Sequence, residues 1–195
     1  SSVYGSNKKS PFKETDKTQT QLSVYAATKK STESIAHSYS HIWKLPITVL
    51  RFFTVYGPWG RPDMAIYLFA DAISKDKTIK VFNNGNMSRD FTYIDDIIAG
   101  IEILLKNPPV EENGNAAYKI SNIGNGSPQS LGNFIKAIET SFGKEAKKEY
   151  LPMQAGDVPQ TWADVSEMEK LGYKSSVGIK EGVENFVNWF KSYSL

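Results

Sequence analysis

The chain has 195 residues, of which 40% are hydrophobic and 23% are charged, enough to build a substantial core in one medium or two small domains. Its formal net charge of +2, with acidic and basic residues interspersed, argues against a specialist for nucleic acid or for a membrane surface. Without cysteine it has no disulfide, thiolate nucleophile or zinc–thiolate site, which fits a reducing compartment, so we expect a cytoplasmic protein.

Helices alternate with strands along the sequence, which is typical of the α/β class with a sheet that is at least partly parallel. No apolar run is long enough to span a bilayer. In chain order the predicted elements are a strand at 1–5, a helix that carries Tyr25 and ends near residue 41, a strand at 46–53, a helix at 64–74, a strand at 78–82, an extended stretch at 90–93, a helix capped by Asp95, a strand at 117–122, a helix that begins at Ser130, and a last helix from residue 179.

The run at 46–53 is continuously apolar and rich in β-branched residues, which predicts a central strand of a parallel sheet, covered on both faces. Binding sites in such sheets lie beyond the carboxyl ends of the strands. We therefore expect Thr54, Tyr56 and the loop at 57–61 to reach a ligand crevice. Ser1 and Ser2 would end a neighbouring strand close to it.

Tyr25 and Lys29 lie four residues apart in a segment without glycine or proline. A helix there carries the phenol and the ammonium on one face, where the cation can stabilise a phenolate. Tyr4 and Lys8 have the same spacing, but a turn at 5–7 separates them. The helical context therefore favours Tyr25 as a proton-transfer residue.

Four motifs occur in order along the chain and carry a family resemblance. They are SSVYG at 1–5, YAATK at 25–29, LRFF at 50–53 and RDF at 89–91. In that order they resemble the carboxyl-terminal part of the extended short-chain dehydrogenase/reductases that act on nucleotide sugars. Within this superfamily, the run LRFFTVYGPWGRPDMA at 50–65 closely resembles the UDP-glucuronate 4-epimerases, as do NNGNM at 83–87 and MQAGDV at 153–158.

The resemblance implies the carboxyl-terminal part of a Rossmann-type parallel sheet together with a smaller α/β substrate-binding domain. We expect the first to comprise 1–62 and 78–107, and the second, which binds the nucleotide sugar, to comprise 63–77 and 108–195. The family's glycine-rich NAD loop does not occur in the sequence, so we expect it upstream of residue 1. On its own this fragment should bind NAD poorly and be inactive, because pyrophosphate recognition depends on that loop.

By this resemblance the protein interconverts UDP-glucuronate and UDP-galacturonate with NAD as cofactor, through a 4-keto intermediate. Tyr25 is expected to act as acid and base at the C4 hydroxyl, while Lys29 holds the nicotinamide ribose. Either Ser1 or Ser2 would hydrogen-bond the same sugar oxygen. Cofactor contacts are expected at Tyr25, Lys29, Phe52 and Phe53, although aromatic residues at strand ends more commonly fill cores.

The resemblance also implies a set of substrate-binding residues. Thr54 and Arg61 would hold the sugar carboxylate, and a fixed carboxylate prevents decarboxylation of the 4-keto uronate, which is a β-keto acid. Arg89 corresponds to the family's diphosphate-binding arginine, and Asp157 to a position near the ribose or the diphosphate. The stretches around the uracil correspond to Met64 and Ala65 and to the run from Lys80 to Phe82.

A few positions separate the sister activities. Where this chain has Ser1 and Ser2, the 4,6-dehydratases carry an Asp-Glu pair and the uronate decarboxylases usually show a Glu at the second position. Gln154 stands where the galactose epimerases have a second phosphate-binding arginine. The alternatives kept open are another UDP-sugar 4-epimerase, a UDP-glucuronate decarboxylase and, from a different class, a catalytically silent nucleotide-sugar-binding or oligomerisation fragment.

Extended members of the superfamily commonly pair through a four-helix bundle that includes the Tyr25 helix. The resemblance therefore implies a homodimer, with Ser34 and Tyr39 near the partner, and a place in polysaccharide biosynthesis. We expect neither nucleic acid nor a membrane as partner. We also expect no metal, because His37 and His41 have helical ligand spacing but no third ligand near them in sequence.

Overall fold

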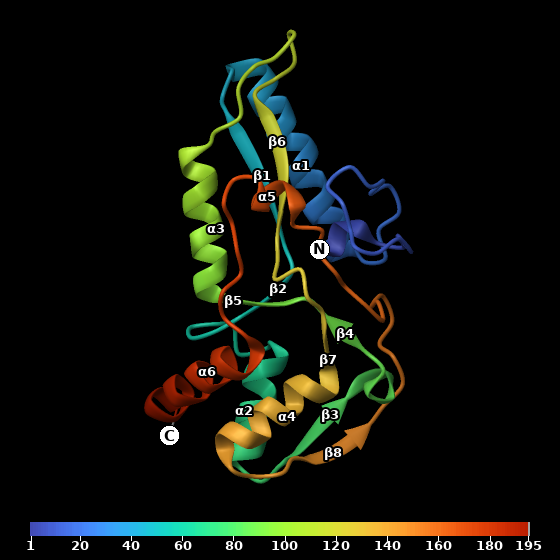
Figure 1. Cartoon of the computed structure of the whole chain (residues 1–195). Helices are drawn as coiled ribbons and strands as arrows, with labels where there is room; N and C mark the ends of the chain where they lie inside the picture. The colour runs from blue at the N-terminus through green and yellow to red at the C-terminus, as the bar shows by residue number, and fades with distance from the viewer. Residues whose placement is uncertain (195) are drawn as a thin grey trace.

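The computed structural model describes residues 1–194, and the chain forms two parts that lie end to end (Figure 1). The first part contains α1 (Val24–Trp43), β1 (Ile47–Phe52), α3 (Ile94–Lys106), β6 (Tyr118–Ile123) and α5 (Ser166–Glu169). The second contains α2 (Ala65–Ser74), β3 (Thr78–Val81), α4 (Leu131–Phe142), β8 (Lys147–Tyr150) and α6 (Ile179–Ser194). Short strands lie between them, β2 (Thr54–Tyr56), β4 (Ser88–Arg89), β5 (Phe91–Tyr93) and β7 (Gln129–Ser130), and 3-10 turns occur at Ser2–Tyr4 and Phe82–Gly85.

The first part is built on a parallel pair, in which β1 runs beside β6 from Ile47 opposite Tyr118 to Phe52 opposite Ile123. Figure 1 shows this pair between α1 and α3. Alternate side chains of β1 point to opposite faces. Arg51 forms an ion pair with Glu33 of α1, whereas Leu50 and Phe52 pack in a cluster with residues of α3. The two helices therefore cover the two faces of the pair.

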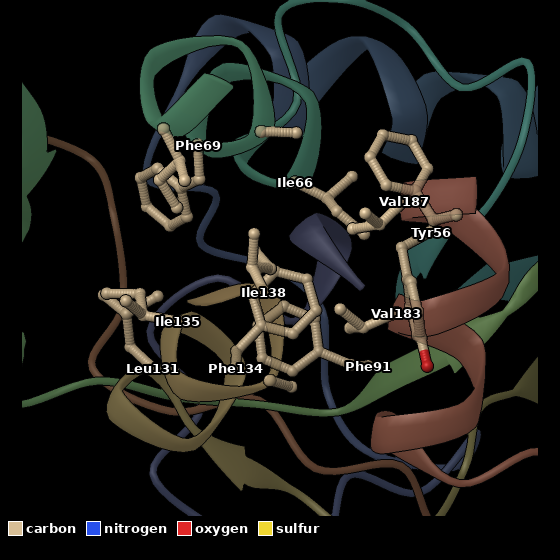
Figure 2. Close-up of a cluster of buried hydrophobic side chains, with 14 of the residues drawn as sticks. Tyr56, Ile66, Phe69, Phe91, Leu131, Phe134, Ile135, Ile138, Val183 and Val187 are labelled. Carbon is tan, nitrogen blue, oxygen red and sulfur yellow. The ribbon is translucent and has the colours of Figure 1, made fainter. Parts of the chain in front are cut away.

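The second part encloses the larger hydrophobic core, which Figure 2 shows in close-up. Helices α2, α4 and α6 supply most of its side chains, and β3, parallel to β8, closes one edge. Each helix buries one apolar stripe, as Phe134, Ile135 and Ile138 do on α4. The Phe134 ring stacks on Phe91 of β5, with 4.0 Å between ring centroids. This contact fastens the second part to the strands between the two parts.

The strands between the two parts carry residues of the expected site. β2 follows directly from β1 and runs parallel to β5, with Thr54 opposite Phe91. β4 runs antiparallel to β7, with Arg89 opposite Gln129. Thr54 and Arg89 therefore lie at the junction, beyond the carboxyl end of β1, which is where ligands bind in sheets of this kind.

The predicted α/β class with parallel strands is confirmed, and most predicted elements form within a residue or two of their expected ends. Ser130 caps α4, since its hydroxyl accepts a hydrogen bond from the Asn133 amide at 3.1 Å. Among the described residues, no helix combines the length and apolar character needed to cross a bilayer.

Three local predictions are wrong. Residues 1–5 form a 3-10 turn rather than a strand, because the Gly5 amide bonds back to Ser2 and the turn carries the buried Tyr4 ring against Phe12. Asp95 lies inside the first turn of α3, whose cap position is Tyr93. The run at 46–53 pairs in parallel as expected, but β1 is only half-buried except at Arg51, since among the described residues one strand alone pairs with it.

Two strand pairs join segments that the expected ranges assign to different domains. β3, which falls in the range 78–107 assigned to the first domain, pairs with β8 of the second part. β6, which falls in 108–195, pairs with β1 of the first part. The domain boundaries themselves stay a prediction.

Candidate active site

Two adjoining cavities lie at the junction of the two parts, one of about 600 Å³ and one of about 170 Å³. Thr54, Arg89 and Asp157 line both, so the cavities form one crevice with these three residues in its middle. The larger cavity lies against α2, β3 and β5. The smaller lies against the turn at Ser2–Tyr4 and the start of α1. Of the other predicted residues, Ala65, Lys80 and Phe82 line the larger cavity and Ser1 and Ser2 the smaller.

An ion pair occupies the middle of the crevice. Arg89 Nη2 lies 2.8 Å from Asp157 Oδ1, and Nη1 donates to the Ser88 carbonyl at 3.0 Å. Burial lowers the pKa of the Arg89 guanidinium below its ordinary value, and the Asp157 carboxylate opposes that shift. Arginine stays charged even so, because its ordinary pKa lies far above neutrality. A fixed cation in a largely dry place is suited to binding an anionic group.

Asp90, beside Arg89, organises the surrounding loops. It was not among the site residues predicted from the sequence. Its fully buried carboxylate accepts hydrogen bonds from the amides of Asn125 at 2.7 Å, and of Gly126 and Ala163 at 3.0 Å each. Burial raises the pKa of this carboxyl, and the hydrogen bonds counter part of that effect. The signal that could have found it is its place in the Arg-Asp-Phe motif, where a carboxylate follows a site cation directly.

Glycine is required where these loops meet. A Cβ on Gly124 would lie 2.6 Å from the Ala163 Cβ and 3.2 Å from a carboxylate oxygen of Asp90. The close approach joins the segment after β6 to the segment that carries Asp157. Asp90 and Gly124 together therefore fix Ala163, which lies six residues after Asp157, against the loop that follows β6.

The start of α1 borders the smaller cavity. Ser23 caps the helix by accepting a hydrogen bond from the Ala26 amide at 3.1 Å, and both residues line the cavity. Tyr25 and Lys29 lie on one helix face as predicted, with Lys29 Nζ 5.4 Å from the centroid of the Tyr25 ring. The Tyr25 side chain is 58% exposed, and neither residue lines a cavity. The pair is open to a ligand that approaches along the exposed side of α1.

Arg61 and Met64 lie beside the larger cavity without lining it. They belong to the loop between β2 and α2, where Arg61 pairs with Asp63 at 3.4 Å and Arg61 Nη2 lies 3.3 Å from the Met64 sulfur. Asp63 does line the cavity. The loop therefore stands at the mouth of the crevice, with the Arg61 guanidinium turned toward solvent.

Phe52 and Phe53 pack on opposite sides of the chain. Phe53 is buried in a small cluster with Tyr4 and Phe12, whereas Phe52 packs in the cluster that includes residues of α3. The Phe52 carbonyl accepts a hydrogen bond from the Ser1 nitrogen at 2.6 Å, which places Ser1 beside the end of β1. The rings fill cores here, and their contact with a cofactor stays a prediction.

The crevice offers three chemical environments in sequence. The larger cavity is lined mainly by apolar side chains, including Leu68, Ile79 and Phe82. The middle holds the Arg89 guanidinium, and the smaller cavity offers the hydroxyls of Ser1, Ser2 and Ser23. Such an arrangement suits an elongated ligand with a flat or apolar group at one end, an anionic centre and a hydroxyl-rich group at the other.

The fold and the crevice define an α/β protein with a ligand site at the carboxyl end of a parallel sheet, and comparison with known proteins identifies its family. Residues 1–124 match the NAD dependent epimerase/dehydratase family, and the chain belongs to that family. This confirms the resemblance read from the sequence motifs.

Curated relatives align with nearly the whole chain. Protein CapI of Staphylococcus aureus is 50% identical, over 99% of this chain and 61% of that protein. The probable UDP-glucuronate 4-epimerase of Rhizobium meliloti is 47% identical, over 97% of this chain and 60% of that protein. The chain thus spans about 60% of the length of these relatives.

Solved structures share the fold. The UDP-glucuronic acid 4-epimerase of Bacillus cereus, in complex with UDP-glucuronic acid and NAD, superposes with a TM-score of 0.88 at 36% identity, over 98% of this chain and 59% of that one. MoeE5 in complex with UDP-glucuronic acid and NAD superposes with a TM-score of 0.86 at 30% identity, over 98% of this chain and 62% of that one. The Rossmann-type class predicted from the sequence is therefore confirmed.

Proposed function

We propose that the parent protein, meaning the protein that carries these residues, is an NAD-dependent UDP-sugar 4-epimerase that interconverts UDP-glucuronate and UDP-galacturonate. The observation that carries this proposal is the continuous crevice, with an apolar end, the Arg89 guanidinium in the middle and hydroxyl groups beside α1. A UDP-uronate has its base, diphosphate and sugar in the same order. The similarity to enzymes solved with UDP-glucuronic acid and NAD supports the same substrate and cofactor.

The exposed pair on α1 fits a nicotinamide cofactor. A phenol and an ammonium on one helix face match the donors and acceptors of ribose hydroxyls, and both groups are open to solvent. When bound, NAD would supply a reversible hydride acceptor for C4 of the sugar. Lys29, whose Nζ lies 5.4 Å from the centroid of the Tyr25 ring, would hold the ribose.

The proton steps fall to Tyr25, on the exposed side of α1, and to the serines that line the smaller cavity. Tyr25 removes the proton from the C4 hydroxyl and returns it after the 4-keto sugar has turned over. Ser1 or Ser2, which line that cavity, hydrogen-bonds the same oxygen. Because one group donates and accepts the same proton, the reaction runs in both directions without a second acid or base.

The remaining residues hold the substrate. Arg89 binds the diphosphate and Asp157 lies beside it, at the ribose or the diphosphate. Lys80 and Phe82 line the apolar end, which receives the uracil together with Met64 and Ala65. Thr54 and Arg61 hold the sugar carboxylate, and this contact keeps the β-keto acid from losing carbon dioxide.

Turnover of UDP-glucuronate tests the proposal. The parent protein is incubated with UDP-glucuronate and NAD and followed by NMR, beside a Tyr25→Phe variant that keeps the ring and loses the hydroxyl. We expect UDP-galacturonate from the unmodified protein and at least about a hundredfold slower formation in the variant, the usual scale of a lost general acid–base group. A UDP-pentose would instead show a decarboxylase, and bound nucleotide without turnover would show the silent binder.

We further propose that residues 1–195 alone are inactive. No Gly-x-Gly-x-x-Gly motif occurs in them, and this motif carries the backbone amides that bind a dinucleotide pyrophosphate. Calorimetry of the isolated chain should show no NAD binding under conditions where the parent protein binds it. Micromolar binding by the isolated chain would contradict this part of the proposal.

We also propose that the parent protein is a cytoplasmic homodimer of polysaccharide biosynthesis, paired through α1. One face of α1 exposes large apolar residues at helical spacing, and a surface of this kind is a common interface between subunits. The residues are Ile35, Tyr39, Ile42 and Trp43.

A further inference from the structure

The loop between β2 and α2 contains a tryptophan in an unusual backbone conformation. Trp59 has φ +63°, in the left-handed region that bulky residues seldom adopt. Such a conformation costs free energy and persists only where surrounding contacts enforce it, typically at ligand clamps and switch segments. The contacts of Trp59 therefore indicate which role this conformation has.

The Trp59 side chain docks on the end of α6. Its ring centroid lies 5.5 Å from that of Trp189 and 5.0 Å from that of Tyr193, in a T-shaped arrangement with the latter. Trp189 and Tyr193 are one helical turn apart and stack on each other at 5.1 Å. The Trp59 ring is nevertheless 73% exposed, so it fills no core. It fastens a loop to a helix surface.

This dock is one of two long-range contacts that the structure shows for the loop, the other being the close approach of Gly57 to Ile94 at the start of α3. Among the described residues, the hydrogen bonds of that turn are local, from the Gly60 amide to Gly57 at 3.3 Å and from the Met64 amide to Arg61 at 3.1 Å. Arg61 and its partner Asp63 are both 70% exposed at the side chain. Of the two long-range contacts, the Trp59 dock is the one nearer to Arg61 in the chain, two residues before it.

We propose that Trp59 is a positioning residue that sets sugar specificity: docked on Trp189 and Tyr193, it holds the loop so that the Arg61 guanidinium can meet a carboxylate at the mouth of the crevice. The inference rests on the proposed function, because it takes the sugar to be a uronate held by Arg61. It adds a residue that touches neither sugar nor cofactor and acts through the loop.

Equilibrium binding to the parent protein tests the inference. Dissociation constants are measured by calorimetry for UDP-glucuronate, UDP-glucose and UDP, with unmodified protein, Trp59→Ala, Trp59→Phe and Arg61→Ala. Trp59→Ala and Arg61→Ala should each raise the dissociation constant of UDP-glucuronate about tenfold or more, the scale of one lost hydrogen bond to a charged group. The dissociation constants of UDP-glucose and UDP should stay unchanged. Trp59→Phe keeps an aromatic dock and should stay within about twofold of the unmodified protein.

A second readout follows the loop directly. Hydrogen exchange of the amides at 57–63 should become faster in Trp59→Ala and change little in Trp59→Phe, because local opening rises when the dock is lost. Equal weakening of all three ligands would instead mark Trp59 as a general structural residue and overturn the inference. Unchanged exchange in Trp59→Ala would overturn it as well.

The failure of the inference and that of the proposed function give different results. If the unmodified protein prefers UDP-glucuronate and the preference is lost in Arg61→Ala but kept in Trp59→Ala, only the role of Trp59 is wrong. If the unmodified protein binds UDP-glucuronate no more tightly than UDP-glucose, the assignment of a uronate substrate is wrong. The proposed role of Trp59 in sugar specificity is then wrong as well. Epimerisation of an uncharged UDP-sugar would then identify the true substrate class.

Discussion

Arg89 is a cation in a largely buried place, and among residues 1–194 its one carboxylate partner is Asp157, at 2.8 Å. Desolvation is costly for both groups, and their attraction offsets it only while the geometry holds. A diphosphate that enters the crevice brings a second anion to the same guanidinium, so it must share Arg89 with Asp157 or displace it. The pair thus keeps Arg89 oriented before the ligand arrives.

Truncation of Arg89 tests this at the level of one side chain. We expect Arg89→Ala to weaken UDP binding to the parent protein about 10- to 100-fold, because hydrogen bonds to a charged group contribute about 1.5–3 kcal/mol. Uridine, which has no diphosphate, should be affected far less. Calorimetry with both ligands measures the difference, and Lys170→Ala, which removes an exposed cation paired with Glu167, serves as control. Equal losses for UDP and uridine would contradict a diphosphate contact.

Helix α1 is fastened to the sheet by a buried ion pair. Arg51 of β1 donates to both carboxylate oxygens of Glu33, at 2.8 Å and 3.0 Å, and Lys30 donates to the same carboxylate at 2.7 Å. Burial by itself would raise the pKa of Glu33, but the hydrogen bonds from Arg51 and Lys30 outweigh it and hold the pKa below its ordinary value of 4.5. The contact fixes the helix that carries Tyr25 and Lys29.

This pair makes the stability of the protein sensitive to acid. Because the pKa of Glu33 is depressed in the folded state, its contribution to the free energy of unfolding is fully present above pH 4.5 and is lost as pH falls through the folded value. Glu33→Ala should lower the free energy of unfolding at pH 7 by about 3–5 kcal/mol, since it leaves Arg51 buried and unpaired. Glu33→Ala should also make the free energy of unfolding fall less steeply as pH drops below 5. Urea denaturation at several pH values measures this.

Glu167→Ala is the matched control, because Glu167 forms an exposed pair with Lys170 on the surface. We expect this substitution to change stability little. If the free energy of unfolding falls as steeply toward low pH in Glu33→Ala as in the unmodified chain, other carboxylates govern acid unfolding.

Elements that depend on local chemistry could be predicted from the sequence, whereas those that depend on distant contacts could not. Ser130 begins a helix because its own hydroxyl caps a nearby amide. The turn at Ser2–Tyr4 depends on burial of Tyr4, whose hydroxyl donates to Asn122 at 2.6 Å, a residue 118 positions away. No propensity scale for the first five residues carries that information.

The same limit applies to the site. Motifs predicted that Thr54, Arg89 and Asp157 belong together, and the structure places all three where the two cavities meet. The motifs did not show that Asp90 holds the surrounding loops, or that Trp59 reaches α6, because both depend on how segments meet in space. Roles assigned by resemblance to Tyr25, Lys29 and Arg61 stay predictions.

For the molecule as a whole, the feature that bears on assembly is the exposed apolar face of α1, formed by Ile35, Tyr39, Ile42 and Trp43. The exposed fraction of Ile42 on this face is 62%. Large apolar side chains at helical spacing rarely remain exposed on a monomer, so pairing of two α1 helices would account for them.

The oligomeric state of the parent protein tests the pairing. We expect a dimer by size-exclusion chromatography with light scattering, and a monomer for Ile42→Glu, because a charge buried in an apolar interface is strongly unfavourable. Leu105→Glu, on α3, is the control and should remain dimeric, since Leu105 is also exposed to solvent, at 76%. A monomeric unmodified protein, or a dimer that survives Ile42→Glu, would contradict pairing through this face.

In the proposed reaction, C4 of the sugar loses a hydride and regains the same one after the keto sugar turns over. UDP-glucuronate labelled with deuterium at C4 is incubated in ordinary water with the parent protein and NAD, and the product is examined by NMR and mass spectrometry. We expect UDP-galacturonate that retains deuterium at C4, because a hydride held on bound NAD would not exchange with solvent. Product with hydrogen at C4, or inversion at a different carbon, would contradict the proposed reaction.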